Sequence, residues 1–147
     1  MAEAPQKDPI TCHVLDTTTG RPAPGIKVTL YNPTVKYAFN AITNEDGRIS
    51  NWSQTDSEVE PRGSVRETLE WIIQNHAENG GNENGPEMAS CPVESSIWEI
   101  EFDTGSYYGL KNTFFPKVKL TFLVKEGQHY HVPLLLGPYS FTTYRGS

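Results

Sequence analysis

The chain of 147 residues has the length of one ordinary domain, and 36% of its residues are hydrophobic, enough for a single buried core. The formal net charge is -6 and the 12 Lys and Arg residues form no basic stretch, which excludes the charge pattern of a nucleic-acid-binding protein. No apolar run reaches the roughly 18 to 20 residues that span a membrane. We expect a single domain over residues 1–147, without nucleic-acid or membrane partners.

Both cysteines are expected to be free thiols in a reducing compartment. Cys12 and Cys91 cannot build a disulfide framework, and neither has the spacing of a metal-binding pair. The first eight residues contain no apolar signal-peptide segment, and the final Arg-Gly-Ser is not a peroxisomal address of the Ser-Lys-Leu type. The sequence therefore favours the cytosol.

Six short segments alternate apolar and polar residues and end in turn formers, which is typical of half-buried β-strands. They are residues 10–16, 26–31, 36–43, 96–102, 117–124 and 129–136. Turn-forming residues fill positions 19–25 and 44–47, after the first and third segments. This pattern predicts a mainly β protein built as an antiparallel sandwich.

The segment from about residue 53 to 95 differs from its flanks and is interpreted as an insertion. It contains the excess of acidic residues and a Gly/Asn-rich run at residues 80–86, which we predict to be mobile because it buries little apolar surface. Ser64 and Glu67 have capping-box spacing. An amphipathic helix is predicted over residues 65–77, with one face made of Val65, Leu69, Ile72, Ile73 and His76.

Strand periodicity places the histidines of residues 129–136 outside the core, because residues two apart share a face. Tyr130, Val132, Leu134 and Leu136 form an uninterrupted apolar face. His129 and His131 lie on the other face with Pro133 and Leu135, a composition that suggests a site at a subunit surface. A solvated pair of histidines is the alternative.

His13 has the same kind of placement in the first strand. It shares an outward face with Thr11 and Leu15, whereas Cys12 and Val14 face the core. Interface packing is the simpler interpretation of this residue taken alone. Arg48 follows the Asp46-Gly47 turn, where a guanidinium could reach across the strand ends, or could simply be solvated.

The residue types favour hydrolysis by activated water over metal or covalent catalysis. The histidines lack a carboxylate or thiolate partner at metal-ligand spacing, so we predict no metal and no cofactor. No Gly-x-Ser-x-Gly elbow, phosphate loop or Cys/His nucleophile pattern is present. Imidazole and guanidinium groups suit water attack on a polarised carbonyl.

Four sequence blocks together resemble the transthyretin-like family, over about residues 8–52 and 96–147. They are His-Val-Leu-Asp at 13–16 with Gly-Arg-Pro-Ala at 20–23, Thr-Asn-Glu-Asp-Gly-Arg at 43–48, His-Tyr-His-Val-Pro-Leu-Leu-Leu at 129–136 and Tyr-Arg-Gly-Ser at 144–147. The last two blocks are similar to the 5-hydroxyisourate hydrolase branch. The thyroid-hormone-carrying branch lacks this terminal tetrapeptide and these histidines.

The resemblance implies a transthyretin-like two-sheet sandwich with one short helix, over about residues 104–110. It also implies a homotetramer with its sites at the dimer–dimer interface. The insertion then replaces a much shorter connection, either as a tolerated surface elaboration or as a helix that covers part of a sheet or a subunit edge. Related enzymes also occur in peroxisomes, which are the alternative compartment.

The implied activity is opening of 5-hydroxyisourate to 2-oxo-4-hydroxy-4-carboxy-5-ureidoimidazoline, a step of urate degradation. The resemblance carries over His13, Arg48 and His131 as catalytic residues, His13, Arg48, Tyr144 and Ser147 as substrate-binding residues, and His129 and Arg145 as secondary candidates. A non-catalytic carrier that uses the same channel is the main alternative. A scaffold whose insertion binds a partner is a second one.

Overall fold

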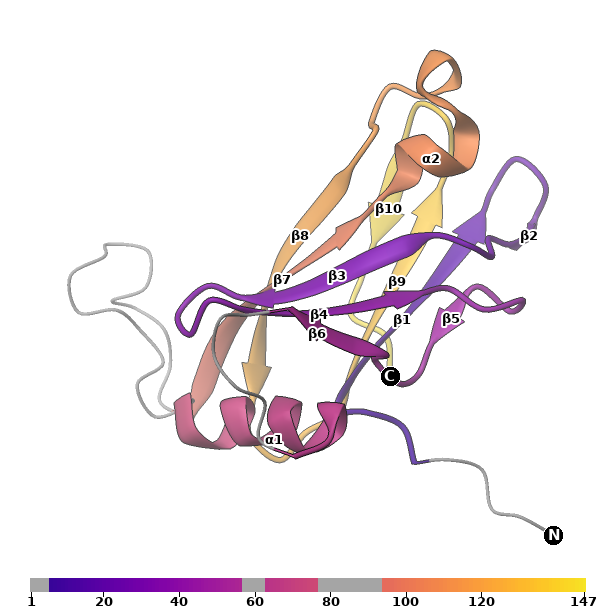
Figure 1. The fold of residues 1–147 in the computed structure, drawn as a ribbon. Coiled ribbons are helices and arrows are strands. Elements are labelled where there is room, and N and C mark those ends of the chain that lie inside the picture. The colour runs from indigo at the N-terminus through magenta and orange to yellow at the C-terminus, as the bar shows by residue number, and fades with distance from the viewer. Residues whose placement is uncertain (1–5, 57–62, 77–93) are drawn as a thin grey trace, which may run out of the picture.

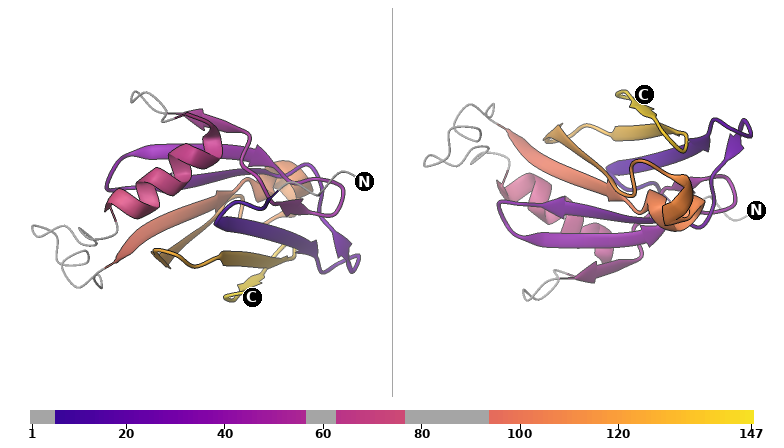
Figure 2. Two further views of the ribbon diagram at one scale, coloured as in Figure 1. Left: turned by 90° about the horizontal axis from the view of Figure 1, so that it is seen from below. Right: turned by 90° about the horizontal axis from the view of Figure 1, so that it is seen from above.

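A computed structural model of the chain describes residues 6–56, 63–76 and 94–147. The Gly/Asn-rich run at residues 80–86 and Cys91 lie outside the described residues. Two five-stranded sheets face each other in this structure (Figures 1 and 2). The first sheet has the order β10-β9-β1-β2, with β5 also paired to β1, and the second has the order β6-β4-β3-β7-β8. The predicted two-sheet sandwich is confirmed.

The predicted strands agree with the observed ones to within one residue at either end, and four short strands were not predicted. The strands are β1 (Ile10–Asp16), β2 (Arg21–Pro22), β3 (Lys27–Asn32), β4 (Tyr37–Ile42), β5 (Arg48–Ile49), β6 (Gln54–Asp56), β7 (Ser95–Phe102), β8 (Val118–Lys125), β9 (Tyr130–Leu136) and β10 (Phe141–Thr143). Strands β2, β5, β6 and β10 have two or three residues each, too few to show a period.

One strand pair departs from the antiparallel arrangement that we expected throughout. β1 and β9 pair in parallel, with Thr11 opposite His131 and His13 opposite Pro133. All other paired strands among the described residues are antiparallel. Residue periodicity gives the face of a side chain but not the direction of a neighbouring strand, so the sequence could not indicate this pair.

The core lies between the two sheets and contains the faces that strand periodicity predicts. Val14 and Leu134 are fully buried in the first sheet, and Trp98 and Ile100 are fully buried in the second. Burying a large apolar side chain contributes roughly 1.5 to 3 kcal/mol, so these facing residues supply much of the stability. Cys12 belongs to this core as a free thiol, and burial raises its pKa to about 12.

Helix α1 (Val65–His76) confirms the helix predicted in the insertion. Its first turn has the expected capping box, because the Glu67 amide donates to Ser64 Oγ (3.1 Å) and the Ser64 amide donates to Glu67 Oε1 (3.4 Å). Leu69 and Ile72 are buried in the main core, and the helix contacts β7. The helix therefore covers part of a sheet, one of the alternatives weighed for the insertion.

The short helix α2 (Thr104–Tyr108) and the 3-10 turn η1 (Leu110–Asn112) occupy the region expected to be helical. The hydroxyls of Tyr107 and Tyr108 donate to the buried carboxylate of Asp16, at 2.8 and 2.9 Å. Thr18 donates to the same carboxylate through its amide and its hydroxyl. Burial opposes the charge of Asp16, but these hydrogen bonds outweigh it and hold its pKa below the ordinary 3.8.

Replacing Asp16 by Asn should lower the free energy of unfolding by about 2 kcal/mol at neutral pH, because hydrogen bonds to a buried charge are lost. The folded-state pKa of Asp16 is depressed. The contribution of its carboxylate is therefore complete above pH 3.8 and disappears as the pH falls through the folded-state value. Urea unfolding at neutral and acidic pH measures this, with the exposed Asp56→Asn as control. An equal Asp16→Asn deficit at both pH values would contradict the assignment.

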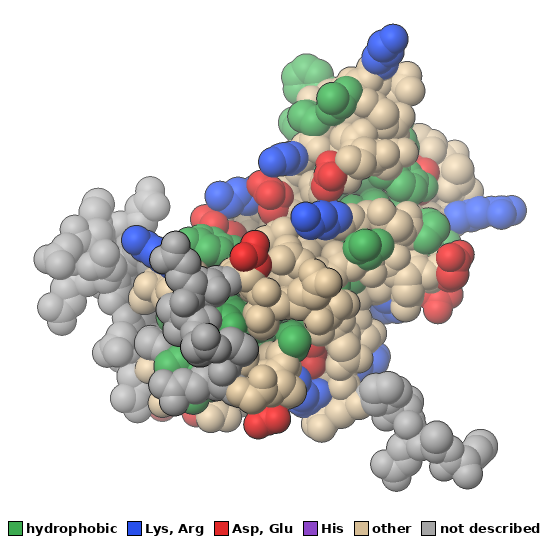
Figure 3. Space-filling model, in the orientation of Figure 1, with side chains coloured by type: hydrophobic (Ala, Val, Ile, Leu, Met, Phe, Trp, Pro, Cys, Tyr) green, Lys and Arg blue, Asp and Glu red, His purple; other side chains and the backbone are tan. Residues whose placement is uncertain are grey.

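No helix within residues 6–56, 63–76 and 94–147 is long and apolar enough to cross a bilayer. On the face that Figure 3 shows, Lys and Arg side chains are spread among acidic ones and do not gather into one patch.

Candidate active site

The parallel pair of β1 and β9 brings two of the predicted histidines together on the outer face of the first sheet. His13 and His131 are both half-buried, and their ring centroids lie 6.4 Å apart. Their strand neighbours Val14 and Val132 point into the core, as the alternation predicts. Of the two histidines for which solvation was the alternative, His131 is half-buried and His129 is exposed.

The turn at residues 44–47 places Arg48 beside these rings. Gly47 has a φ of 70°, and a Cβ at this position would collide with the Val14 carbonyl oxygen. Asn44 Oδ1 accepts hydrogen bonds from the amides of Asp46 (2.9 Å) and Arg48 (3.0 Å), which closes the turn. β5 then pairs with β1 so that Arg48 lies opposite His13.

The terminal tetrapeptide returns to the same face and lies against His131. The Gly146 amide donates to the His131 carbonyl oxygen at 2.9 Å, forming an isolated antiparallel bridge. A Cβ at Gly146 would lie 2.7 Å from His131 Cδ2 and 3.1 Å from Pro133 Cγ. Glycine at this position therefore lets the tail approach the imidazole closely.

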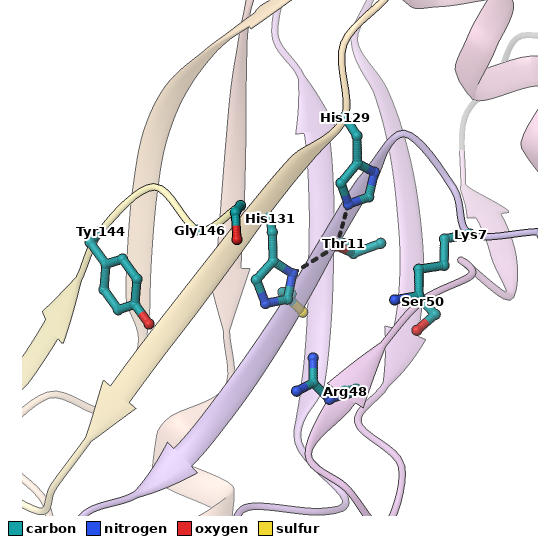
Figure 4. Close-up of a pocket in the computed structure, with 10 residues that line it drawn as sticks. Lys7, Thr11, Arg48, Ser50, His129, His131, Tyr144 and Gly146 are labelled. Atoms are coloured by element: carbon teal, nitrogen blue, oxygen red, sulfur yellow. Dashed lines mark hydrogen bonds between the residues drawn. The ribbon is translucent and has the colours of Figure 1, made fainter.

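A cavity of about 280 Å³ opens where these elements meet. Figure 4 shows the Arg48 guanidinium pointing toward the His131 ring, with Tyr144 on one side and Lys7 on the other. The lining residues are Lys7, Thr11, Cys12, Arg48, Ser50, His129, His131, Tyr144, Gly146 and Ser147. The volume suits one small ring compound and its polar contacts.

Two of the predicted site residues lie outside this lining. His13 is adjacent to His131 but does not line the cavity within the single chain. Arg145 turns away, since its guanidinium carbon lies 4.5 Å from the centroid of the Tyr130 ring and it also donates to Gln128. Arg145 therefore contacts the flank of β9 and not the cavity.

Thr11 is the clearest residue that the sequence interpretation did not select. Its hydroxyl lies 2.8 Å from His131 Nδ1 and 3.3 Å from His129 Nε2 (Figure 4). Because Nδ1 of His131 has this partner, Nε2 remains for a molecule in the cavity. Alternation placed Thr11 on the same face as His13, which was the available signal. Lys7 and Ser50 were also missed, and they lie outside every strand.

Burial and positive charge both favour the neutral form of the two imidazoles. Burial lowers the pKa of His13 below 6.5, and the nearby Arg48 lowers it further against the opposing effect of Asp46. Burial also lowers the pKa of His131 below 6.5, and the positive charge of Arg48 lowers it further. The charge of Lys7 acts in the same direction with a smaller effect. Neutral imidazoles can accept a proton from water near neutral pH.

Titration of the histidine ring protons by NMR should therefore give pKa values below 6.5 for His13 and His131. Replacing Arg48 by Gln removes a positive charge and should move both pKa values upward. The matched variant Arg21→Gln removes an exposed charge on β2 and should leave them in place. Unchanged values in Arg48→Gln would contradict the electrostatic coupling.

No three His, Cys, Asp or Glu side chains in the described part of the chain are grouped to hold a metal ion. The side chains that line the cavity supply imidazoles, a guanidinium, an ammonium, hydroxyls, a phenol and the Cys12 thiol. These groups can bind an anionic ring, polarise a carbonyl and transfer protons to and from water.

Residues 10–146 match the family described as the HIUase/Transthyretin family. The chain belongs to this family. A Schizosaccharomyces pombe protein named probable 5-hydroxyisourate hydrolase is 33% identical over 151 residues, covering 97% of this chain and 94% of that protein. The family match thus extends across both sheets and as far as Gly146 in the terminal tetrapeptide.

Solved structures of this family show the same fold. Klebsiella pneumoniae 5-hydroxyisourate hydrolase aligns with a TM-score of 0.60 and 24% identity, over 94% of this chain and 98% of that one. Transthyretin from Sparus aurata aligns with a TM-score of 0.61 and 19% identity, over 94% and 96%. Because the enzyme and transthyretin fit equally well, the fold does not decide between them, and function rests on the site residues.

Proposed function

We propose that this protein hydrolyses 5-hydroxyisourate to 2-oxo-4-hydroxy-4-carboxy-5-ureidoimidazoline in urate degradation. The observation that carries the proposal is that His131, Arg48 and the terminal tetrapeptide meet at one small cavity. The proposal is also supported by the 33% identity, over nearly the full chain, to the relative named probable 5-hydroxyisourate hydrolase. A non-catalytic carrier does not need a neutral imidazole beside a guanidinium, so this pair of groups favours the hydrolase.

The proposed reaction is addition of water to a ring carbonyl followed by cleavage of the adjacent carbon–nitrogen bond. His131 accepts a proton as the water oxygen bonds to the carbonyl carbon. The carbon–nitrogen bond then breaks, the nitrogen takes up the proton that His131 accepted, and the carbon becomes a carboxyl group that loses its proton to solvent. His131 lines the cavity with Nδ1 bound to Thr11, so we assign the contact with water to its Nε2.

The remaining site residues bind substrate and stabilise charge. Arg48 faces the cavity and stabilises the oxyanion that forms when water adds to the carbonyl. Tyr144 and Ser147 hold the ring from the tail side. His13 serves as the second imidazole beside His131, at a centroid separation of 6.4 Å.

We also propose that the working enzyme is a homotetramer whose subunits enclose each cavity at the dimer–dimer interface. The cavity lies on the outer face of the first sheet, outside the sandwich core. Tyr144 is 58% exposed in the single chain, and Leu15 and Leu135 are only half-buried beside the histidines. Sedimentation velocity at assay concentration should show a tetramer, and activity in the monomer alone would contradict the proposal.

A coupled assay tests the activity directly. Urate oxidase generates 5-hydroxyisourate, and its decay is followed spectrophotometrically with and without this protein. We expect decay well above the spontaneous rate and proportional to protein concentration. Unaccelerated decay, combined with stoichiometric binding of a small ring ligand, would favour the carrier.

A further inference from the structure

Arg66, on the inserted helix α1, reaches the segment that leads into β1. Its Nη1 donates to the carbonyl oxygens of Lys7 (2.6 Å) and Gln6 (3.0 Å). The same atom lies 3.7 Å from the Asp8 carboxylate. One guanidinium from the insertion therefore contacts three consecutive residues of the N-terminal segment.

Both sides of this contact are fixed to the rest of the molecule. On the helix, Arg66 Nε pairs with Glu70 Oε1 at 2.7 Å, and Leu69 anchors α1 in the core. On the segment, the buried Asp8 carboxylate accepts the Trp52 amide at 2.7 Å, and the Asp8 amide donates to Ser50 at 2.8 Å. Residues 6–8 are therefore held between α1 and residues 50–52.

This segment places a cation at the cavity. Lys7 lines it together with Arg48 and His131 (Figure 4), and its charge is one of those that hold the pKa of His131 low. A second groove, of about 610 Å³, begins at Lys7 and His129 and is lined on its other side by Arg66 and neighbouring residues of α1. The inserted helix therefore adjoins the cavity through Lys7.

We propose that Arg66 is a positioning residue that holds residues 6–8 so that the Lys7 ammonium binds the anionic ring or carboxylate in the cavity. The proposal rests on the proposed function for the identity of that anion. Lysine acts as a point charge on a flexible stem, so its contribution depends on where its backbone is held. The insertion thereby takes part in substrate binding and not in the chemical step.

The kinetic test uses Lys7→Met, Arg66→Met and the double variant. Each single variant should raise KM for 5-hydroxyisourate about tenfold, the effect of one charged hydrogen bond, with kcat changed less than twofold. The double variant should be no worse than Lys7→Met, because both changes remove the same contact. Lys27→Met and Arg21→Met, at exposed positions of β3 and β2, are the matched controls.

Additive effects, or a loss in kcat with KM unchanged, would overturn the positioning role. Arg66→Lys, which keeps a donor for the two carbonyls, should recover part of the KM loss. A general destabilisation by Arg66→Met would lower kcat and the melting temperature together. In that case the KM of Arg66→Lys decides whether Arg66 positions Lys7.

Hydrogen exchange followed by mass spectrometry separates this proposal from the proposed function. Arg66→Met should speed exchange in a peptide that contains the Asp8 amide, which donates to the Ser50 carbonyl oxygen, whereas Lys7→Met should not. Unchanged exchange in Arg66→Met overturns the proposal whatever the activity. If the wild type fails to accelerate 5-hydroxyisourate decay, the proposed function fails, and urate binding measured by calorimetry is used in place of KM. Weaker urate binding in both Lys7→Met and Arg66→Met supports the role of Lys7. Binding equal to that of the wild type refutes it.

Discussion

Replacing His131 by Ala is expected to lower kcat/KM for 5-hydroxyisourate by about 10²-fold to 10⁴-fold, the usual contribution of one acid or base. The imidazole lines the cavity, carries a pKa lowered by burial and by Arg48, and has Nδ1 bound to Thr11. No other imidazole in the described chain combines these contacts. The coupled assay measures the loss.

The His131→Ala protein should still fold, because the His131 side chain lies on the outer face of the first sheet and not in the core. Circular dichroism and the melting temperature check this. His129→Ala is the matched variant, since His129 is an exposed cavity residue with only the 3.3 Å contact to Thr11, and its loss should stay below tenfold. A folded His131→Ala protein with a rate within twofold of wild type would refute the proposed mechanism.

Replacing Arg48 by Met should lower kcat by about 10²-fold to 10³-fold, the effect of removing one oxyanion donor. Gly47 and the turn closed by Asn44 fix the backbone of this residue, and its register with His13 aims the guanidinium at the cavity. Methionine keeps an unbranched apolar stem but removes the guanidinium group and its charge. Single-turnover kinetics separate this loss from weaker substrate binding.

Arg21→Met provides the comparison for removal of an arginine from an exposed turn-flanking strand. A kcat that stays within twofold of wild type while only KM rises would mean that Arg48 binds the ground state and does not stabilise the transition state.

Much of the fold follows from local patterns that the sequence displays. Alternation was sufficient for β1 and β9 because both strands are long and half-buried, and the Ser64–Glu67 spacing was sufficient for the start of α1. The pairing partner of each strand is a long-range property. The parallel pair and the short strands β2, β5, β6 and β10 could not be predicted for that reason.

The candidate site was likewise predictable only where it depends on local sequence patterns. Alternation predicted that His13 and His131 face outward, but their proximity depends on the β1–β9 register. Thr11 acquires its role only because that register sets it opposite His131. No local sequence pattern marks Lys7 as a site residue, because its position depends on Arg66 in a helix distant in sequence. The tail was selected by family resemblance alone.

The parallel pairing of β1 with β9 also affects the order in which the molecule folds. The antiparallel pairs β3–β4 and β7–β8 join strands that are close in sequence, whereas β1 and β9 close a loop that contains most of the chain. Loop-closure entropy makes such a long-range pair form late. We expect the second sheet to nucleate folding and the first sheet to close on it afterwards. Catalytic activity should then return only in the slowest refolding phase, after the backbone amides of β3, β4, β7 and β8 have become protected from hydrogen exchange.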